Sequence, residues 1–565
     1  MRQSADRSTS SELPSTIRTA TELPDRRTFL RATAGAAALA TGLSTASPVA
    51  ADEDYDTVID VVADLGADNT GDEPINDVLE EAVDDDTKVV FPDGEYWIDG
   101  SFRNDQVSNV ALVGEGDATL LPTEDTASII LVLGGTHIHI ENLTIDMSAE
   151  DTSAGIRVEV EDGLVIRDVL FAGAGDGPGG PTEEYGDNGE RHGPFNIVPA
   201  VTDPDGTGII ENVHMPDGTV PYYRKGGVWV ANEHAGHLQF ERCSFERFSD
   251  NALYASGAGV PGRGEDGSVG VENCYFANNN TTAIRLGTPG SYAKHCTVVT
   301  ERDEVPPVPW GAVTARAGWV WYGFDGYYED IDVVSNHPRG MGIYTHGSHT
   351  DSLRISNCRF ELNVQGTHAV RTFEDESQIT VENSSVTAEF GGDGIMTFAG
   401  NEIDIDNCCL YQRRFARDGF ELDSVTGTIA NSVIDVEGEQ FVVDGDTDVQ
   451  VTNVHDDADG GCPSPDPDHD FESTEPGPTP TPPDDTGRDE RLVSGTPAET
   501  PTATPEPTPT PSPEPTATPE PTATPTDTDT ADAATPGFTI LVTLGALATA
   551  AGALFRRFGD DRGRS

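Results

Sequence analysis

The hexapeptide Ile355-Ser356-Asn357-Cys358-Arg359-Phe360 recurs in variant form along this chain. Its frame is apolar, polar, Asn, small or thiol, polar, apolar, and other clear copies lie at 271–276, 381–386, 405–410 and 429–434. In the second half of the chain the asparagines of this frame stand at positions 357, 383, 407, 431 and 453. A repeat of about 24 residues is one supersecondary unit, which buries its apolar face only by stacking on neighbouring units.

We call the position of Asn357 in this frame the ladder slot. Asparagine fills the slot in several earlier repeats, and other residues replace it elsewhere. The earlier asparagines are Asn109, Asn142, Asn212 and Asn273, and the replacements are Asp168, Arg242, His295 and Asp330. Stacked asparagines would form a ladder of side-chain amides at one turn of each coil.

The repeat length fits a coil of three short strands joined by turns. Between the copies of the frame lie short segments of alternating apolar residues, such as 155–160 and 394–398, which are typical of strands with one face inward. A leucine-rich repeat has a similar period, but its L-x-x-L-x-L frame is absent. The pattern predicts an all-β fold, a right-handed parallel β-helix (a solenoid) over residues 105–460.

The cysteines follow the same repeat. Five of the seven directly follow the ladder slot: Cys243, Cys274, Cys296, Cys358 and Cys408. This shared place favours a stack of small buried side chains over a disulfide framework. A zinc site is not indicated either, because no C-x-x-C motif occurs.

The segment before the repeats carries a family resemblance. Residues 60–72 contain an Asp-Leu-Gly-Ala strand pattern, a short helical pattern follows at 75–83, and 88–98 reads Lys-Val-Val-Phe-Pro-Asp-Gly-Glu-Tyr-Trp-Ile. This order resembles the N-terminal cap of pectate-lyase-like and polygalacturonase-like β-helix proteins. The resemblance implies a cap over 52–104, whose helix covers the open end of the first coil and prevents edge pairing.

The charge of the chain limits its partners. The 565 residues include 99 acidic and 33 basic ones, which gives a net charge of −66. Such a surface argues against nucleic-acid binding, which needs a basic face. It suits a protein that stays hydrated in concentrated salt. Only three of the basic residues are lysines, a bias that resembles proteins of extreme halophiles.

Both ends of the chain carry targeting patterns. Residues 1–51 contain the pair Arg26-Arg27, an Ala-rich apolar run and a small-residue end, which together predict a twin-arginine (Tat) export signal handled by the Tat translocase. Residues 461–535 are rich in Pro, Thr, Asp and Glu and predict a disordered stalk.

Residues 536–565 begin with Pro-Gly-Phe, continue as an apolar run and end in an Arg cluster. This order resembles the PGF-CTERM sorting segment of haloarchaeal surface proteins, which an archaeosortase-like enzyme replaces with a lipid. The alternative is a permanent transmembrane helix. Both predict an exported body held at the cell surface, with the Arg pair inside.

One outward-facing column is the candidate binding surface. Aligning the strands by their small-then-apolar start places one residue of each coil outward, because strand side chains alternate. The column reads Arg157, Trp229, Tyr254, Arg285, Tyr344, Arg371, Met396 and Glu421. Aromatic faces suit sugar rings and arginines suit carboxylates, which predicts that the column binds an acidic polysaccharide or glycoconjugate. The alternative is an exposed sheet face of good strand formers.

Several residues near this column are candidate catalysts. By resemblance to pectate lyases, Arg285 is the base or carboxylate clamp, with Ca²⁺ neutralising the substrate carboxylate. His346 lies two residues beyond the column. A hydrolase would need two carboxylates, for which Asp250 with Asp393 or Asp418 are candidates. The catalytic motifs of both families are absent, and each aspartate has the alternative role of a turn residue.

Three long insertions, 172–206, 257–268 and 301–324, interrupt the repeats. Long loops of a solenoid tend to lie on its binding face. The chain also contains N-x-[ST] sequons. Those at Asn279 and Asn280 lie in a predicted turn and are the expected glycosylation sites, whereas Asn142 and Asn383 occupy the ladder slot and are expected to be buried.

Two hypotheses on function therefore stay open. In the first, an exported, surface-anchored β-helix binds an acidic polysaccharide and cleaves it as a lyase or hydrolase. In the second, the solenoid is a non-catalytic adhesin or structural component of the cell envelope. The sequence does not identify the substrate.

Overall fold

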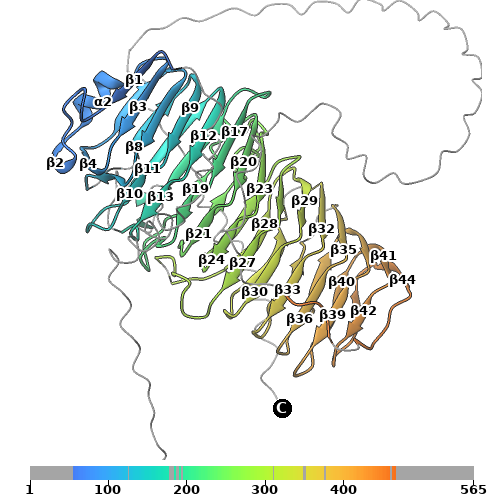
Figure 1. Cartoon of the computed structure of the whole chain (residues 1–565). Helices are drawn as coiled ribbons and strands as arrows, with labels where there is room; N and C mark the ends of the chain where they lie inside the picture. Colours follow the sequence, from blue (N-terminus) through green and yellow to red (C-terminus); the bar gives the residue numbers. More distant parts are fainter. Residues whose placement is uncertain are drawn as a thin grey trace, which may run out of the picture. The chain divides into compact units, whose positions relative to one another are not determined.

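The computed structural model describes residues 55–465, except 125, 127, 177–183, 186–189, 192–194, 310, 348–350, 374–376 and 459–460. The described chain forms a right-handed parallel β-helix, in which coil after coil stacks along one axis (Figure 1). Three long parallel sheets make its walls, and each coil adds one strand to sheet A, then to sheet B, then to sheet C. The predicted fold is confirmed.

The strands of sheet A, in stacking order, are β1 (Thr57–Asp60), β3 (Thr87–Phe91), β6 (Val110–Gly114), β9 (Thr136–Glu141), β12 (Asp162–Arg167), β17 (Thr207–Glu211), β20 (His237–Glu241), β23 (Ser268–Glu272), β26 (Tyr292–Lys294), β29 (Asp325–Glu329), β32 (Ser352–Ser356), β35 (Gln378–Glu382), β38 (Glu402–Asp406), β41 (Thr426–Ala430) and β44 (Asp448–Thr452). Those of sheet B are β2 (Thr70–Pro74), β4 (Gly94–Ile98), β7 (Ala118–Pro122), β10 (Thr144–Asp146), β13 (Leu170–Ala172), β18 (His214–Met215), β21 (Ser244–Glu246), β24 (Tyr275–Ala277), β27 (Thr297–Thr300), β30 (Asp332–Ser335), β33 (Arg359–Leu362), β36 (Ser385–Ala388), β39 (Cys409–Gln412) and β42 (Val433–Asp435). Those of sheet C are β5 (Phe102–Asp105), β8 (Ser128–Leu133), β11 (Gly155–Val160), β16 (Ile197–Val201), β19 (Val228–Trp229), β22 (Leu253–Tyr254), β25 (Thr282–Leu286), β28 (Arg316–Val320), β31 (Met341–Thr345), β34 (Val370–Arg371), β37 (Met396–Ala399), β40 (Phe420–Asp423) and β43 (Phe441–Asp444). A separate antiparallel pair, β14 (Glu184–Tyr185) and β15 (Glu190–Arg191), lies between β13 and β16 in the chain.

The expected helix over 75–83 is present as α2 (Asn76–Ala82). Its buried residues Leu79 and Ala82 belong to the same apolar core that runs through the coils. The first coil has no strand in sheet C, and α2 takes that place next to β5, the terminal strand of the sheet.

The ladder slot is a left-handed turn residue between sheet A and sheet B. The expected members of the slot share a positive φ near 50–56°. Asn109 was wrongly assigned to it, because it directly precedes β6 and so lies between sheets C and A. Asparagine tolerates this region better than most residues, which explains why the slot is Asn-rich. Side-chain amides also connect successive coils, because Asn407 donates to Asn383 and Asn453 donates to Asn431, each at 2.8 Å. The predicted amide ladder is confirmed for these coils.

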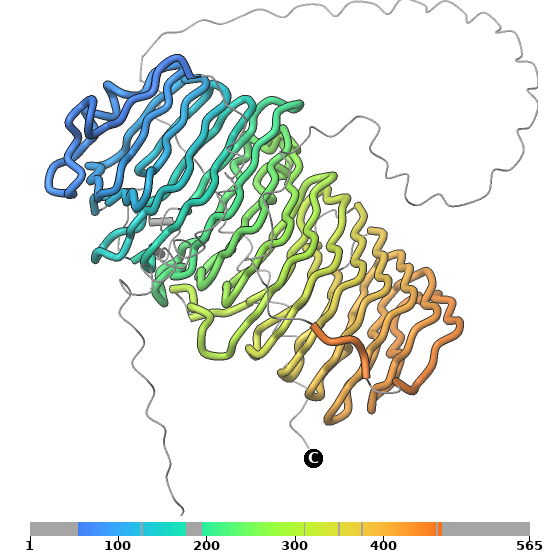
Figure 2. The backbone as a smooth tube through the Cα atoms, viewed as in Figure 1, coloured from blue at the N-terminus to red at the C-terminus, as the bar shows by residue number. Residues whose placement is uncertain are grey.

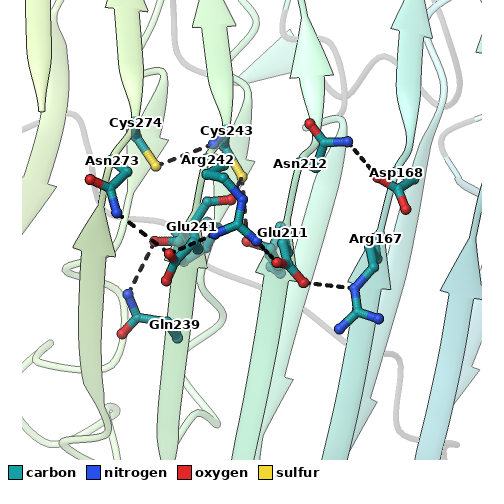
Figure 3. Close-up of polar contacts among 12 residues, drawn as sticks. Arg167, Asp168, Glu211, Asn212, Gln239, Glu241, Arg242, Cys243, Asn273 and Cys274 are labelled. Atoms are coloured by element: carbon teal, nitrogen blue, oxygen red, sulfur yellow. Dashed lines mark hydrogen bonds and ion pairs between the residues drawn. The ribbon is translucent and has the colours of Figure 1, made fainter. Parts of the chain in front are cut away.

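Arg242 replaces asparagine in one coil and adds charge to the ladder. Its guanidinium forms ion pairs with Glu211 of the preceding coil and with Glu241, the latter at 2.8 Å (Figure 3). Arg167 pairs with the other oxygen of Glu211 at 2.6 Å. Glu211, Glu241 and Glu272 stand opposite one another on successive strands, so Arg242 offsets a row of like charges.

The cysteine stack is also confirmed. All five cysteines that follow the ladder slot are buried free thiols. The sequence did not reveal a pairing of the remaining two, Cys409 and Cys462, which form a disulfide. Cys409 begins β39, where its side chain faces outward from sheet B, whereas Cys408 before it faces the core.

Two of the predicted insertions are shorter than expected. Residues 197–201 form β16 and residues 316–320 form β28, so 172–206 and 301–324 each contain a regular rung of sheet C. Their strands lack the frame used for the alignment, and only parallel pairing with β11 and β25 reveals them. The predicted signal 1–51, almost all of the stalk and the segment 536–565 lie outside the described residues. No helix among the described residues is long and apolar enough to cross a membrane.

A buried lysine lies next to the N-terminal strands of sheet C. Lys225 is 1 % exposed, and its ammonium group donates to the Ser153 hydroxyl at 2.6 Å. None of the described carboxylates pairs with it. Burial lowers the pKa of Lys225 from 10.5 to about 7, because a charged amine loses its hydration there.

We expect Arg242→Ala to lower the free energy of unfolding by about 2–4 kcal/mol, because Glu241 loses its cation and Glu211 keeps only Arg167. Arg103→Ala is the matched control: it breaks the exposed pair with Asp105 and should cost less than about 1 kcal/mol. Urea denaturation of both variants measures the difference. Equal losses would show that the Arg242 network adds nothing beyond a surface ion pair.

Lys225 should make stability depend on pH. Between about pH 7 and 10.5 the unfolded chain binds a proton at Lys225 that the folded chain lacks, so stability should rise with pH across this window. Lys225→Met combined with Ser153→Ala should therefore stabilise the protein by on the order of 2–4 kcal/mol at pH 7. The gain in stability of the double variant over the wild type should become smaller towards pH 10. Denaturation midpoints of wild type and variant at pH 7 and 10 test this, and a constant difference would refute it.

Candidate functional site

The outer face of sheet C contains the predicted column. Strand register places Tyr254 beside Trp229, and Arg285 beside Tyr254. From Arg285 the register continues through Trp319, Tyr344 and Arg371 on successive strands. The next residue in this row is Thr397, because Met396 pairs with Val370 of the inward row and is fully buried.

Met396 was therefore misplaced, and three residues of the column were missed, namely Val198, Trp319 and Thr397. Met396 was wrongly placed outward, since its strand enters the sheet one residue out of step with the small-then-apolar alignment. Trp319 was missed because β28 was taken for part of an insertion. Among the sequence signals, only the aromatic cluster Trp319-Val320-Trp321-Tyr322 could have revealed this rung.

The polar residues at the two ends of the column are engaged by neighbouring groups. Arg157 forms an ion pair with Glu159 of its own strand at 2.6 Å. At the other end, Glu421 accepts hydrogen bonds from the Gly394 main-chain N–H at 2.8 Å and from Thr397 at 3.3 Å. Trp229 packs beside Phe195, with ring centroids 6.0 Å apart. These residues therefore offer less free hydrogen-bonding capacity than the centre of the column.

Arg285 is the centre of an aromatic cluster. Its guanidinium carbon lies 3.9 Å from the ring centroid of Tyr254, 4.1 Å from that of Trp321 and 5.3 Å from that of Trp319. The residue is only 6 % exposed. Its Nε–H and the indole N–H of Trp321 are both buried without a hydrogen-bond acceptor among the described residues.

A second arginine lies one coil further. The Arg316 guanidinium lies 4.1 Å from the Trp319 ring and 5.8 Å from the Tyr344 ring. Nη1 donates to the carbonyl oxygens of Thr281 and Thr314, and Nε has no acceptor. Burial, with the neighbouring positive charges of Arg285 and Arg371, lowers the pKa of Arg316 to about 10.

His346 and Tyr344 complete this cluster. The His346 ring stacks on Trp321 with centroids 3.4 Å apart and planes 11° apart. Burial and the charges of Arg285 and Arg316 lower the pKa of His346 to about 4, so the imidazole is neutral near pH 7. Tyr344 is buried, and its hydroxyl hydrogen-bonds the Arg371 side chain.

We call this group the cationic-aromatic face. Its members come from β22, β25, β28, β31 and β34 or directly follow these strands. They are Tyr254, Arg285, Arg316, Trp319, Trp321, Tyr344, His346 and Arg371. Within the described part of the chain, none of its three arginines has a carboxylate at ion-pair distance. This is unexpected in a chain whose acidic residues outnumber its basic ones three to one.

Asp250 does not act as an available base. Arg224 binds it at 2.6 Å, and its other oxygen accepts two hydrogen bonds from Asn251. Burial alone would raise the pKa of Asp250, but the charge and hydrogen bond of Arg224 hold it below its usual value. The carboxylate is therefore ionised and engaged.

The predicted carboxylate pairs are too far apart. In sheet C five strand steps separate the coil of Asp250 from that of Asp393, and six separate it from that of Asp418. At about 4.8 Å per step these separations are roughly 24 and 29 Å, against the 6.5–9.5 Å of an inverting hydrolase. Asp393 and Asp418 do lie on adjacent coils, but Asp418 accepts a 2.7 Å hydrogen bond from the Glu439 main chain, as a turn residue does. The pairing of Asp250 with either residue is wrong.

The residues of the cationic-aromatic face do not fit calcium. Ca²⁺ requires several oxygen ligands, usually carboxylates. This face presents arginines and aromatic rings, and its nearest aspartate, Asp250, is held by Arg224. No group of three or more His, Cys, Asp or Glu side chains among the described residues is arranged to hold a metal ion.

The expected exposure of the sequons is reversed. Asn279 and Asn280 are buried, and their amides donate to main-chain carbonyls, including Phe245 at 2.8 Å and Ala312 at 2.9 Å. In contrast, Asn142 and Asn383 are exposed. The reason is that the ladder slot is a left-handed turn on the outside of the coil, so its stacked side chains lie at the surface.

Comparison with solved structures returns matches at low sequence identity and low TM-score. The catalytic unit of the GH87 α-1,3-glucanase from Streptomyces thermodiastaticus matches at 12% identity over 75% of this chain and 73% of that chain, with a TM-score of 0.42. The Streptococcus pneumoniae surface protein and adhesin PfbA matches at 11% identity over 70% and 98%, with a TM-score of 0.29. These matches concern the fold alone. No protein-family model and no curated protein matches the chain.

We expect glycopeptide mass spectrometry of the native protein to find no glycan on Asn279 or Asn280, because both amides are enclosed by main chain. Any N-glycan within the described residues should be on Asn142 or Asn383, the exposed sequons. The peptides at Asn279 and Asn280 should appear unmodified at full intensity. A glycan on either would contradict this packing.

Proposed function

We propose that the cationic-aromatic face binds an acidic polysaccharide or glycoconjugate. The observation that carries the proposal is the state of Arg285, a buried cation with three aromatic neighbours and no carboxylate partner among the described residues. The proposed setting is the one expected from the sequence: Tat export, followed by attachment to the cell surface through the C-terminal stalk and sorting segment.

A buried charge normally requires compensation. Moving an ion from water into a protein costs several kcal/mol unless partners replace its hydration. Each aromatic ring at the distances seen here returns about 0.5–2 kcal/mol. The Nε–H of Arg285 and the indole N–H of Trp321 are buried without an acceptor among the described residues. An anionic group bound at this face would compensate the charge of Arg285.

The shape of the face favours a polymer over a small anion. Its residues follow the solenoid axis over five successive strands of sheet C, at about 4.8 Å per strand. Aromatic rings stack against the apolar faces of sugar rings, and arginines donate hydrogen bonds to carboxylate or sulfate groups. A saccharide chain along the axis would meet both in turn.

Binding is better supported than cleavage. No predicted pair of carboxylates spans one glycosidic bond, and Asp250 is engaged by Arg224. A lyase needs a base near the clamped carboxylate, for which neutral His346 is the nearest candidate. The alternative is a non-catalytic adhesin or envelope component, which would bind the polysaccharide through the same face without cleaving it.

Arg285→Gln should weaken binding to an acidic polysaccharide about 10- to 100-fold, because it removes one charge-assisted contact. The probes are polygalacturonate, alginate and a sulfated galactan, and affinities are measured by calorimetry at two salt concentrations. The variant should keep its melting temperature, since a costly buried charge disappears.

Arg354→Gln is the matched control. Arg354 lies on the outer face of sheet A, is exposed and pairs with Glu382 at 2.5 Å, so its loss should leave binding unchanged. Equal weakening by both variants would reduce the effect to general charge. No binding of any probe by the wild type would refute the proposal. Absorbance of unsaturated products during the same incubations separates a lyase from an adhesin.

A further inference from the structure

The chain does not end at its last coil. After β44 it turns back over the outside of sheet B, against the direction in which the coils were added (Figure 2). Ala458 donates to the Asp435 carboxylate in the coil of β42, at 3.1 Å. Pro463 accepts a 2.7 Å hydrogen bond from Ser385 at the start of β36. The returning segment therefore crosses the coils of β42, β39 and β36.

One covalent bond fixes this return. The disulfide between Cys409 and Cys462 joins the returning segment to the first residue of β39. Everything between these two cysteines, including β40, β41, β42, β43 and β44, is a closed covalent loop. Tension applied to the chain beyond residue 465 passes through the disulfide into β39 and does not enter the loop.

The place of entry decides how the solenoid responds to tension. Coils contact only their neighbours, so an end coil is held through one interface and an interior coil through two. Without the disulfide, tension would reach the last rung, in which His455 bridges only Val433 of β42 and β44 pairs only with β41, and would peel the coils one after another. With it, tension reaches β39, which pairs with both β36 and β42.

We propose that the Cys409–Cys462 disulfide is a mechanical clamp for a body tethered through its C-terminal chain. It moves the point of loading from the end coil to an interior coil and keeps the C-terminal coils out of the force path. The function is to hold the solenoid folded while a bound ligand pulls against the anchor. The clamp rests on the expected C-terminal attachment and is independent of the cationic-aromatic face.

The expected location outside the cell is compatible with a disulfide that acts as a mechanical clamp. A disulfide persists in an oxidising environment and not in a reducing cytosol. The other five cysteines are buried thiols, so oxidation would form this bond without disturbing the core. The disulfide thus supplies a covalent link only where the chain would be under load, outside the cell.

Single-molecule pulling tests the clamp on the full chain. One handle is attached at exposed position 302 and the other at the C-terminus, so that the N-terminal coils stay outside the force path. The first unfolding event of the wild type should need about twofold more force than that of the Cys409→Ser/Cys462→Ser double variant, because two coil interfaces resist in place of one. The variant should also release on the order of 180 Å more contour length, the extent of about 52 residues.

Two further measurements keep the result unambiguous. Ser385→Ala, which removes a hydrogen bond to the same segment and leaves the disulfide intact, should unfold at the wild-type force. Wild type in a reducing agent should behave as the double variant. The extra contour length shows only that the disulfide exists. If it appears while the first unfolding force is equal with and without the bond, the clamp is refuted.

Discussion

Parallel pairing between successive coils is the interaction on which the rest of this structure depends. Each strand of the three sheets hydrogen-bonds only to the strands of the coils before and after it. Stability is then a sum of nearest-neighbour terms, and the two ends are the weak points. The two ends are held differently: helix α2 packs next to β5, the terminal strand of sheet C, and a returning segment with a disulfide fastens the last coils.

The same stacking explains how side chains far apart in sequence come together. Tyr254, Arg285 and Trp319 are neighbours because three strands align in register, although long loops separate them along the chain. The register also places these arginines beside aromatic rings, and no described carboxylate lies at ion-pair distance from them. In a chain with a net charge of −66, this lack of ion-pair partners is the basis on which we propose the face as a binding surface.

The spacing of the ladder slot predicted some features of the fold correctly and one wrongly. Its spacing gave the repeat length, the cysteine stack and the amide ladder. Its exposure was wrong, because the sequence shows that asparagines recur but not whether the turn that holds them faces inward. The left-handed φ of Asn142 and Asn383 places them outside, and the same geometry tolerates Arg242 in one coil. The predicted exposure of Asn279 and Asn280 was wrong for the opposite reason, because a neighbouring insertion packs over that turn.

The sequence by itself determined the fold class, the capping helix and most of the outward column, because a repeated apolar pattern has one way to bury itself. Only the tertiary structure decided which polar residues meet. Asp250 forms an ion pair with Arg224, and Trp319 lies on a strand that lacks the repeat frame. Cys409 forms a disulfide with Cys462 because the chain reverses its direction after the last coil. These contacts join residues whose spacing follows no period, so only the folded path of the chain can specify them.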